Sequence, residues 1–258
     1  MKITSLLENT ACSSEVEAEH GLSLYIETEN RKILFDMGQT TLFASNAEAL
    51  GISLGEVDMA VLSHGHYDHG GGLAKFLEIN SKAPVYINRD AFLPHYNGTE
   101  KYIGLDTFLA DSQRIIFVGD ECRIGDGLTL FSCNGNERKY TLGGAELTEK
   151  VGEIFIPDDF RHEQYLLIEE DGKRTLISGC SHKGILNIVE WFTPDILVGG
   201  FHFSKLPLDD ILTAAAQALD AYPTEYYTCH CTGIEQYEFM KSQMKRLNYL
   251  SCGESIVI

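Results

Sequence analysis

The segment from Met59 to Gly72 constrains the fold of this chain more than any other, and it reads M-A-V-L-S-H-G-H-Y-D-H-G-G-G. Its beginning, Met59–Ser63, is a short apolar run that predicts a buried strand. Three histidines and one aspartate follow within six positions, and glycines come directly after them. Glycines at 65 and 70–72 allow the turn to fold tightly and to bring the backbone close to a bound ion.

The histidines and the aspartate of this turn have the spacing of metal ligands. His64 and His66 are two residues apart, so their side chains point the same way if the backbone stays extended. Asp68 and His69 follow on a turn that enters a helix. Neutral imidazoles and a carboxylate are the ligand set of Zn, Mn and Fe sites. The alternative is an exposed polar loop without an ion, which a lone H-x-H would favour but the full pattern does not.

The rest of the chain alternates short apolar runs with helical stretches. Leu208–Tyr222 is the clearest amphipathic helix, and the strands Tyr165–Glu170 and Arg174–Ser178 flank a hairpin turn. Both halves of the chain show strands followed by strand–helix units, which predicts two packed sheets with helices outside. We predict one α/β (α+β) domain over residues 1–258, in which residues 89–160 supply loops over the cleft. The side chains that this region would place over the cleft are Tyr96, Tyr102, Phe108, Asn134 and Tyr140. Its aromatic rings could stack on a planar substrate, and they could equally belong to the core.

Charge and composition exclude several classes of partner. The formal net charge is -18, which repels nucleic-acid backbones and fits anionic membranes poorly. A small anionic substrate would need a local positive charge, which a bound metal ion supplies. The N-terminus has no apolar signal region, no apolar run reaches the length of a membrane span, and the seven cysteines form no secreted framework. These features predict a cytoplasmic protein, and its acidic surface is compatible with a homodimer.

Several motifs together resemble one protein family. S-H-G-H-Y-D-H-G-G-G-L resembles the H-x-H-x-D-H signature of the metallo-β-lactamase superfamily. I-L-F-D-M-G, which contains Asp36, resembles its first motif, a strand-end aspartate beside the metal histidines. L-I-S-G-C-S-H-K-G-I-L-N, V-G-G-F-H-F and C-H-C-T-G resemble the branch related to 7,8-dihydropterin-6-methyl-4-(β-ribofuranosyl)-aminobenzene-5′-phosphate synthase. The resemblance covers most of the chain.

The resemblance implies a four-layer αββα sandwich of two mixed sheets with a two-metal site at one edge. It implies that His64 and His66 bind the first metal, and that Asp68 and His69 bind the second. His230 matches the last ligand position of the second metal. The expected cofactor is a pair of divalent ions, Zn first, with Mn or Fe as alternatives.

The remaining ligand positions depart from the family pattern. Most relatives have a bridging aspartate where this chain has Cys180, which is either a thiolate ligand that favours Zn or Fe over Mn, or a bystander. His182 is the predicted third ligand of the first metal. Its rival is His162, which lies in a charged run that looks more mobile. His202, which follows a strand, is a metal neighbour, a substrate contact or a structural histidine. The two histidines without a motif, at 20 and 95, are predicted to be structural or on the surface.

The implied activity is metal-dependent hydrolysis, in which a metal-activated water attacks a phosphoester or a carbonyl group. The branch implies a dihydropterin-linked condensation instead. Asp36 would orient a ligand histidine or accept a proton, and Asp68 is the other candidate for proton transfer. Two alternatives from other classes are an iron-dependent oxidoreductase or dioxygenase, and a metal or redox sensor without turnover.

Overall fold

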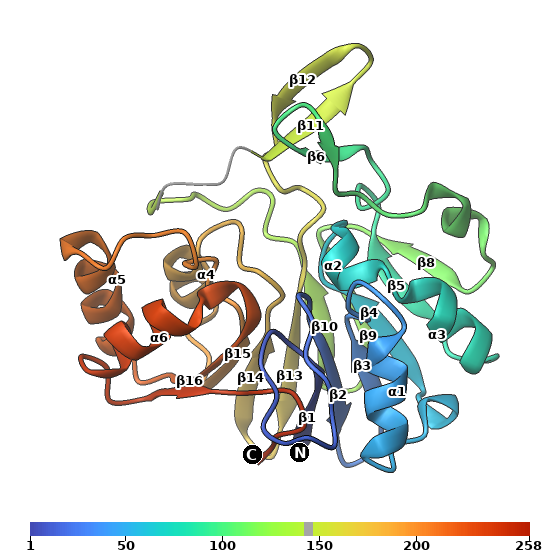
Figure 1. Cartoon of the computed structure of the whole chain (residues 1–258), viewed down its shortest axis with the longest axis horizontal. Helices are drawn as coiled ribbons and strands as arrows, with labels where there is room; N and C mark the ends of the chain where they lie inside the picture. Colours follow the sequence, from blue (N-terminus) through green and yellow to red (C-terminus); the bar gives the residue numbers. More distant parts are fainter. Residues whose placement is uncertain (142–146) are drawn as a thin grey trace. The chain divides into compact units, whose positions relative to one another are not determined.

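The computed structural model describes residues 1–141 and 147–258, and the chain divides into two compact units (Figure 1). Of the described residues, 1–119, 147–164 and 251–258 belong to the first unit, and 120–141 and 165–250 to the second. Each unit has its own seven-stranded sheet and its own hydrophobic core. That they act as the single domain predicted for residues 1–258 stays a prediction.

The sheet of the first unit is mixed, as predicted. Its antiparallel part contains, in spatial order, β18 (Ser255–Val257), β1 (Lys2–Leu7), β2 (Ser23–Glu27) and β3 (Lys32–Phe35). Its parallel part continues from β3 through β4 (Met59–Leu62), β5 (Val85–Asn88) and β8 (Ile115–Val118). All four residues of β4 are buried, which agrees with the unbroken apolar run before the histidines.

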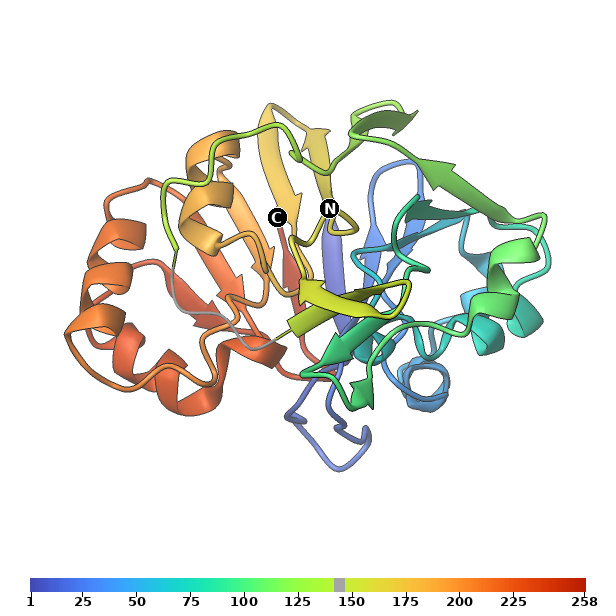
Figure 2. The ribbon, with the colours of Figure 1, turned by 90° about the horizontal axis from the view of Figure 1, so that it is seen from above.

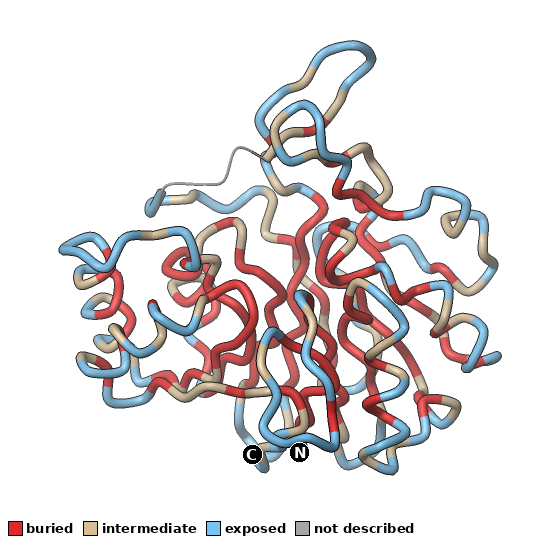
Figure 3. Tube along the Cα trace, in the orientation of Figure 1, coloured by how far each residue is buried: buried red, intermediate tan, exposed pale blue. Residues whose placement is uncertain are grey.

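Two helices complete the core of this unit. Helix α1 (Leu42–Ala49) contributes Phe43, and α3 (Leu73–Ile79) contributes Phe76; both rings are fully buried. Figure 3 shows that buried residues are concentrated along the strands of the large sheets. The sequence predicts helices over 41–50 and 72–80, and the structure confirms both. A 3₁₀ turn, η1 (Leu54–Glu56), leads into β4.

A small sheet also belongs to the first unit, and all of its strands fall in the region predicted to be loops. It contains β12 (Ile154–Pro157), β11 (Leu147–Val151), β6 (His95–Asn97) and β7 (Lys101–Tyr102). Tyr96 packs edge to face against Tyr102 and Phe155, with ring centroids 5.3 and 5.0 Å apart. A further 3₁₀ turn, η2 (Thr107–Asp111), exposes 86% of Phe108, so this ring is not part of a core. That residues 89–160 cover a site stays a prediction.

The sheet of the second unit, like that of the first, has an antiparallel part and a parallel part. Its antiparallel part contains β9 (Glu121–Gly125), β10 (Leu128–Phe131), β13 (Tyr165–Glu170) and β14 (Lys173–Ile177). Its parallel part continues from β14 through β15 (Ile196–Gly199), β16 (Glu225–Thr228) and β17 (Leu247–Tyr249). The predicted hairpin between β13 and β14 is confirmed.

Three helices, α4 (Ile185–Phe192), α5 (Asp210–Asp220) and α6 (Ile234–Lys241), pack into the core of the second unit (Figure 2). Helix α5 begins inside the predicted range because Asp209 caps it, accepting a hydrogen bond from the Ile211 backbone at 2.9 Å. The sequence predicts a helix over 234–247, but α6 ends at Lys241 because Leu247 already pairs with Tyr226 in the sheet. Among the described residues, the structure contains no helix with the length and apolar character needed to cross a bilayer.

Candidate metal centre

The carboxyl ends of β3 and β4 bring two motifs of the first unit together. The two strands are parallel and pair Phe35 with Val61, so the residues that follow them meet at the same edge of the sheet. Asp36 donates its N–H to the Val61 carbonyl at 2.9 Å, and its Oδ1 accepts from the Ser63 N–H at 2.7 Å. The backbone of Asp36 is left-handed, with φ 61°, which costs about 1–3 kcal/mol and is typical of functional sites.

The carboxylate of Asp36 determines which nitrogens of two histidines carry a proton. Its Oδ2 lies 2.6 Å from Nδ1 of His69 and 2.7 Å from the Ser63 hydroxyl. A carboxylate only accepts, so the His69 proton is on Nδ1 and its Nε2 is unprotonated in the neutral ring. The Ser63 hydroxyl donates to Asp36 and accepts from Nδ1 of His64 at 2.8 Å, which leaves His64 with the same tautomer.

The histidines of the motif fit a metal ion in both geometry and protonation. The ring centroid of His64 lies 4.5 Å from that of His66 and 4.2 Å from that of His69, and all three side chains are buried. Burial, together with the neighbouring His162, holds the pKa of His66 well below its usual value, against the opposing effect of Asp68. The neutral imidazole is the form that binds metals, so these donors suit the expected ion.

Asp68 and His69 lie inside a short helix, α2 (Tyr67–Gly70), where a turn entering a helix was predicted. An Asp68 carboxylate oxygen, Oδ2, is 3.1 Å from Nε2 of His20. Because no motif surrounds His20, the sequence predicts a structural or surface residue. The structure confirms that His20 is exposed, and its contact with Asp68, a predicted ligand, is one that no sequence motif indicates.

The environment predicted for His162 is wrong. The charged run looks mobile in the sequence, but the side chain of His162 is 1% exposed. Its Nε2 lies 3.3 Å from Oδ2 of Asp158, and Nδ1 of His95 lies 2.9 Å from the same oxygen. Burial would raise the pKa of Asp158, but hydrogen bonds from His162 and His95 lower it far below the usual range, so the group is a carboxylate. With His66 these residues form a buried group whose possible ligand atoms lie within 4.8 Å of one another.

The second unit places its candidates at the ends of three neighbouring parallel strands. Cys180 follows β14, His202 follows β15 and His230 follows β16. Ser181, His202 and His230 are left-handed, with φ 59°, 57° and 49°. With Asp36, they make up four of the eight described residues other than glycine that have positive φ. Backbone strain in both units is therefore concentrated beside the candidate residues.

Inside the second unit, Cys180, His230 and Cys231 each offer a ligand atom within 4.8 Å of the others, and all three are buried. This group contains Cys180 and Cys231 but not Cys229, which precedes His230 in the sequence. The rings of His182 and His202 are 4.4 Å apart between centroids. The sequence predicts that His182 begins the helix over 185–192, but Gly184 is the N-cap of α4, so His182 lies before this helix. That Cys180, His182 and His230 bind metal stays a prediction.

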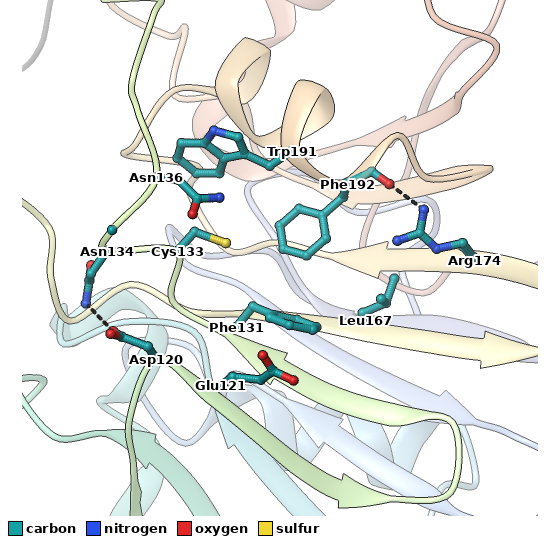
Figure 4. A pocket seen from close by; sticks show the side chains of 11 residues that line it. Asp120, Glu121, Phe131, Cys133, Asn134, Asn136, Leu167, Arg174, Trp191 and Phe192 are labelled. Atoms are coloured by element: carbon teal, nitrogen blue, oxygen red, sulfur yellow. Dashed lines mark hydrogen bonds between the residues drawn. The ribbon is translucent and has the colours of Figure 1, made fainter.

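A separate hollow of about 490 Å³ lies in the second unit and contains none of these candidate ligands (Figure 4). Phe131 and Phe192 meet in it edge to face at 5.5 Å, and Arg174 donates to the Phe192 carbonyl at 2.5 Å. Asn134, one of the predicted cleft residues, donates to Asp120 at 3.2 Å on its rim. The volume of the hollow suits a small molecule. However, the side chains of Arg174 and Asn134 already donate hydrogen bonds to protein atoms.

Comparison with known proteins agrees with the motifs over the length of the chain. The family model described as the metallo-beta-lactamase superfamily matches residues 16–222. The uncharacterized protein MJ0448 of Methanocaldococcus jannaschii is 31% identical over 267 residues, which cover 99% of this chain and 100% of the relative. The 7,8-dihydropterin-6-methyl-4-(beta-D-ribofuranosyl)-aminobenzene-5′-phosphate synthase of the same organism is 28% identical over 288 residues, which cover 99% and 96%.

Solved structures show the same fold. Tm1679, described as a metal-dependent hydrolase of the β-lactamase superfamily, superposes with a TM-score of 0.86 at 29% identity and covers 100% of this chain and 99% of its own. Zn(2+)-bound PqqB from Methylobacterium extorquens, at 14% identity and a TM-score of 0.62, shares the fold and covers both chains completely. The predicted fold class is thereby confirmed, and the chain belongs to the metallo-β-lactamase superfamily.

Proposed function

We propose that this protein is a metal-dependent hydrolase that acts on a small anionic substrate and binds two divalent ions, with Zn as the expected metal. The observation that carries the proposal is the hydrogen bonding of Asp36 and Ser63, which gives His64 and His69 the same tautomer in a buried, closely spaced group. A histidine that only fills space needs no such arrangement. The proposed ligands are His64, His66, Asp68, His69, His182 and His230.

The residues around the motif have distinct roles in this proposal. Bound ions would activate a water molecule and polarise the scissile phosphoester or carbonyl group. Asp36 positions His69 directly and His64 through the Ser63 hydroxyl. Asp68 binds metal or handles the proton of the attacking water, and His20 lies beside its carboxylate. Positive charge at this place would offset the net charge of -18 when an anion binds.

A second candidate is a synthase reaction on a dihydropterin. Similarity to the aminobenzene phosphate synthase extends over 99% of this chain, so it is not confined to the metal motif. The two candidates differ in their products. A hydrolase releases an alcohol or an acid from a phosphoester or lactone, whereas the product named for the synthase is a dihydropterin joined through a methyl group to an aminobenzene that carries a ribose phosphate.

The test begins with protein purified without added metal. We expect elemental analysis to find Zn or Mn, and we expect hydrolysis of bis-nitrophenyl phosphate or of a lactone that stops on chelation and returns with Zn²⁺. Formation of a pterin conjugate in a parallel reaction would support the synthase. A coloured, iron-containing protein that consumes oxygen would contradict hydrolysis and favour the redox alternative. Bound metal without turnover of any of these substrates would favour the sensor.

The role of Cys180 gives a separate prediction. If its thiolate binds metal, Cys180→Asp replaces a soft sulfur by an oxygen and should keep or strengthen binding of Mn²⁺ relative to Zn²⁺. Cys180→Ser should weaken Zn²⁺. Metal preference is measured by competition with a chelator of known affinity, and Cys122→Ser, a half-exposed cysteine of the same unit, is the matched control. If both Cys180 variants behave like the wild type, the cysteine is a bystander.

A further inference from the structure

We infer that His162 is a positioning residue and not a metal ligand: it holds the backbone between His64 and His66 through the N–H of Gly65. This inference rests on the proposed function, because it concerns the same metal motif. It gives the two candidates for the third ligand different roles: His182 remains the predicted ligand, and His162 positions the backbone.

The hydrogen bonds of His162 assign both of its ring nitrogens. The Gly65 N–H donates to Nδ1 of His162 at 2.9 Å. A backbone amide can only donate, so Nδ1 is the acceptor and the ring proton is on Nε2. Nε2 in turn faces the carboxylate of Asp158 at 3.3 Å. If His162 kept the bond to Gly65 and also bound an ion through Nε2, it would have to lose both ring protons.

Asp158 fixes the ring that makes this contact. Its Oδ1 accepts from the Phe160 N–H at 2.7 Å, and its Oδ2 serves both His162 and His95. The rings of His95 and His162 are tilted by 36°, with centroids only 3.9 Å apart. Rotation of His162 would therefore break the bond to Asp158 and displace the ring of His95.

The segment that contains His162 also contacts the residues just before His64 at two more points. Gln164 donates its N–H to the Ser63 carbonyl at 2.8 Å and its side-chain amide to the Leu62 carbonyl at 2.7 Å. We call residues 158–164 the clamp segment. It bonds Leu62, Ser63 and Gly65, the residues immediately around His64.

A second contact also confines Gly65. A side-chain carbon built on Gly65 would lie 2.1 Å from the carbonyl oxygen of Ala91, so only glycine fits. The backbone at Gly65 is thus confined both by Ala91 and by its hydrogen bond to the ring of His162. Because the backbone is confined here, the side chains of His64 and His66 have a fixed direction. Ligands that are oriented before the ion arrives bind it more tightly.

The test compares His162→Ala with His162→Asn. The Asn carbonyl oxygen occupies roughly the position of Nδ1 and still accepts from Gly65, but the variant has no ring nitrogen for a metal. Chelator competition should show that His162→Ala lowers Zn²⁺ affinity about 10–100-fold, whereas His162→Asn stays within about threefold of the wild type. The absorption spectrum of the Co²⁺ protein should keep its wild-type coordination bands in His162→Asn. His182→Ala, a predicted ligand, should lower the affinity more than His162→Ala.

Hydrogen exchange of the metal-free proteins tests the contact itself. The Gly65 amide should exchange faster in His162→Ala than in the wild type and should be protected again in His162→Asn. If the Gly65 amide exchanges at the wild-type rate in His162→Ala, the inference is wrong. It is also wrong if His162→Ala and His162→Asn lose the same amount of Zn²⁺ affinity and the Co²⁺ bands of His162→Asn change. Failure of the wild type to bind Zn²⁺ or Co²⁺ would contradict the proposed function instead, while the exchange result would still decide the role of His162.

Discussion

A protein carrying both His64→Ala and His66→Ala is expected to retain its fold and to lose its metal and its hydrolytic activity. Catalytic zinc sites generally use three protein ligands and one water, so the loss of two ligands leaves the first metal with too few. Both side chains follow the end of β4 and neither belongs to the hydrophobic core cluster of the first unit. We therefore expect a loss of stability of only about 1–3 kcal/mol, typical of substitution at buried positions.

The experiment measures metal stoichiometry by elemental analysis and stability by thermal unfolding. Lys75→Ala is the control, because Lys75 forms an exposed ion pair with Glu78 on a helix of the same unit. Wild-type metal content in the double variant would show that these histidines are not ligands. A double variant that fails to fold would show that they are needed for structure instead.

Asp36→Asn is expected to reduce metal affinity about 10–100-fold while changing the shape of the side chain very little. Three donors, the Ser63 N–H, the Ser63 hydroxyl and Nδ1 of His69, converge on the two oxygens of Asp36. An amide offers one oxygen and turns an N–H₂ group toward one of these donors. The unsatisfied buried contact should also cost about 1–3 kcal/mol of unfolding free energy.

Asp58→Asn is the matched control for this substitution. Asp58 directly precedes β4, at the opposite end of the same strand pair, and accepts from the Lys32 N–H at 2.9 Å. We expect Asp58→Asn to leave metal affinity unchanged in a chelator competition. If Asp36→Asn binds Zn²⁺ as tightly as the wild type, Asp36 does not control the tautomers of the ligand histidines.

Local sequence predicted those parts of the fold and site that depend on neighbouring residues. The apolar run of β4, the turn that carries His64 and His66, and the helix inside Leu208–Tyr222 are each specified by a few adjacent side chains. Asp36 was predicted to lie near the histidines because the resemblance to the family supplies that contact. The structure adds how the contact is made, through Ser63.

The buried group around Asp158 could not be predicted in this way. His95 and Asp158 are 63 positions apart, and they meet because the small sheet pairs β6, which begins at His95, with β11, and β11 with β12, which ends just before Asp158. In the sequence, the residues around Asp158 are charged, and a charged run usually indicates solvent exposure. Burial became favourable because two imidazoles share one carboxylate oxygen, and this compensation depends on tertiary structure.

Synthesis of the chain supplies the metal motif and the clamp segment at very different times. Gly65 and His162 are 97 positions apart, so at about 5–20 residues per second the motif emerges roughly 5–20 s before the ring that holds it. The strand β18, which pairs with β1, emerges later still. During that interval the histidines occupy a glycine-rich segment without its supporting hydrogen bonds. On our inference, tight metal binding is therefore acquired late in folding, after the long-range contacts have closed.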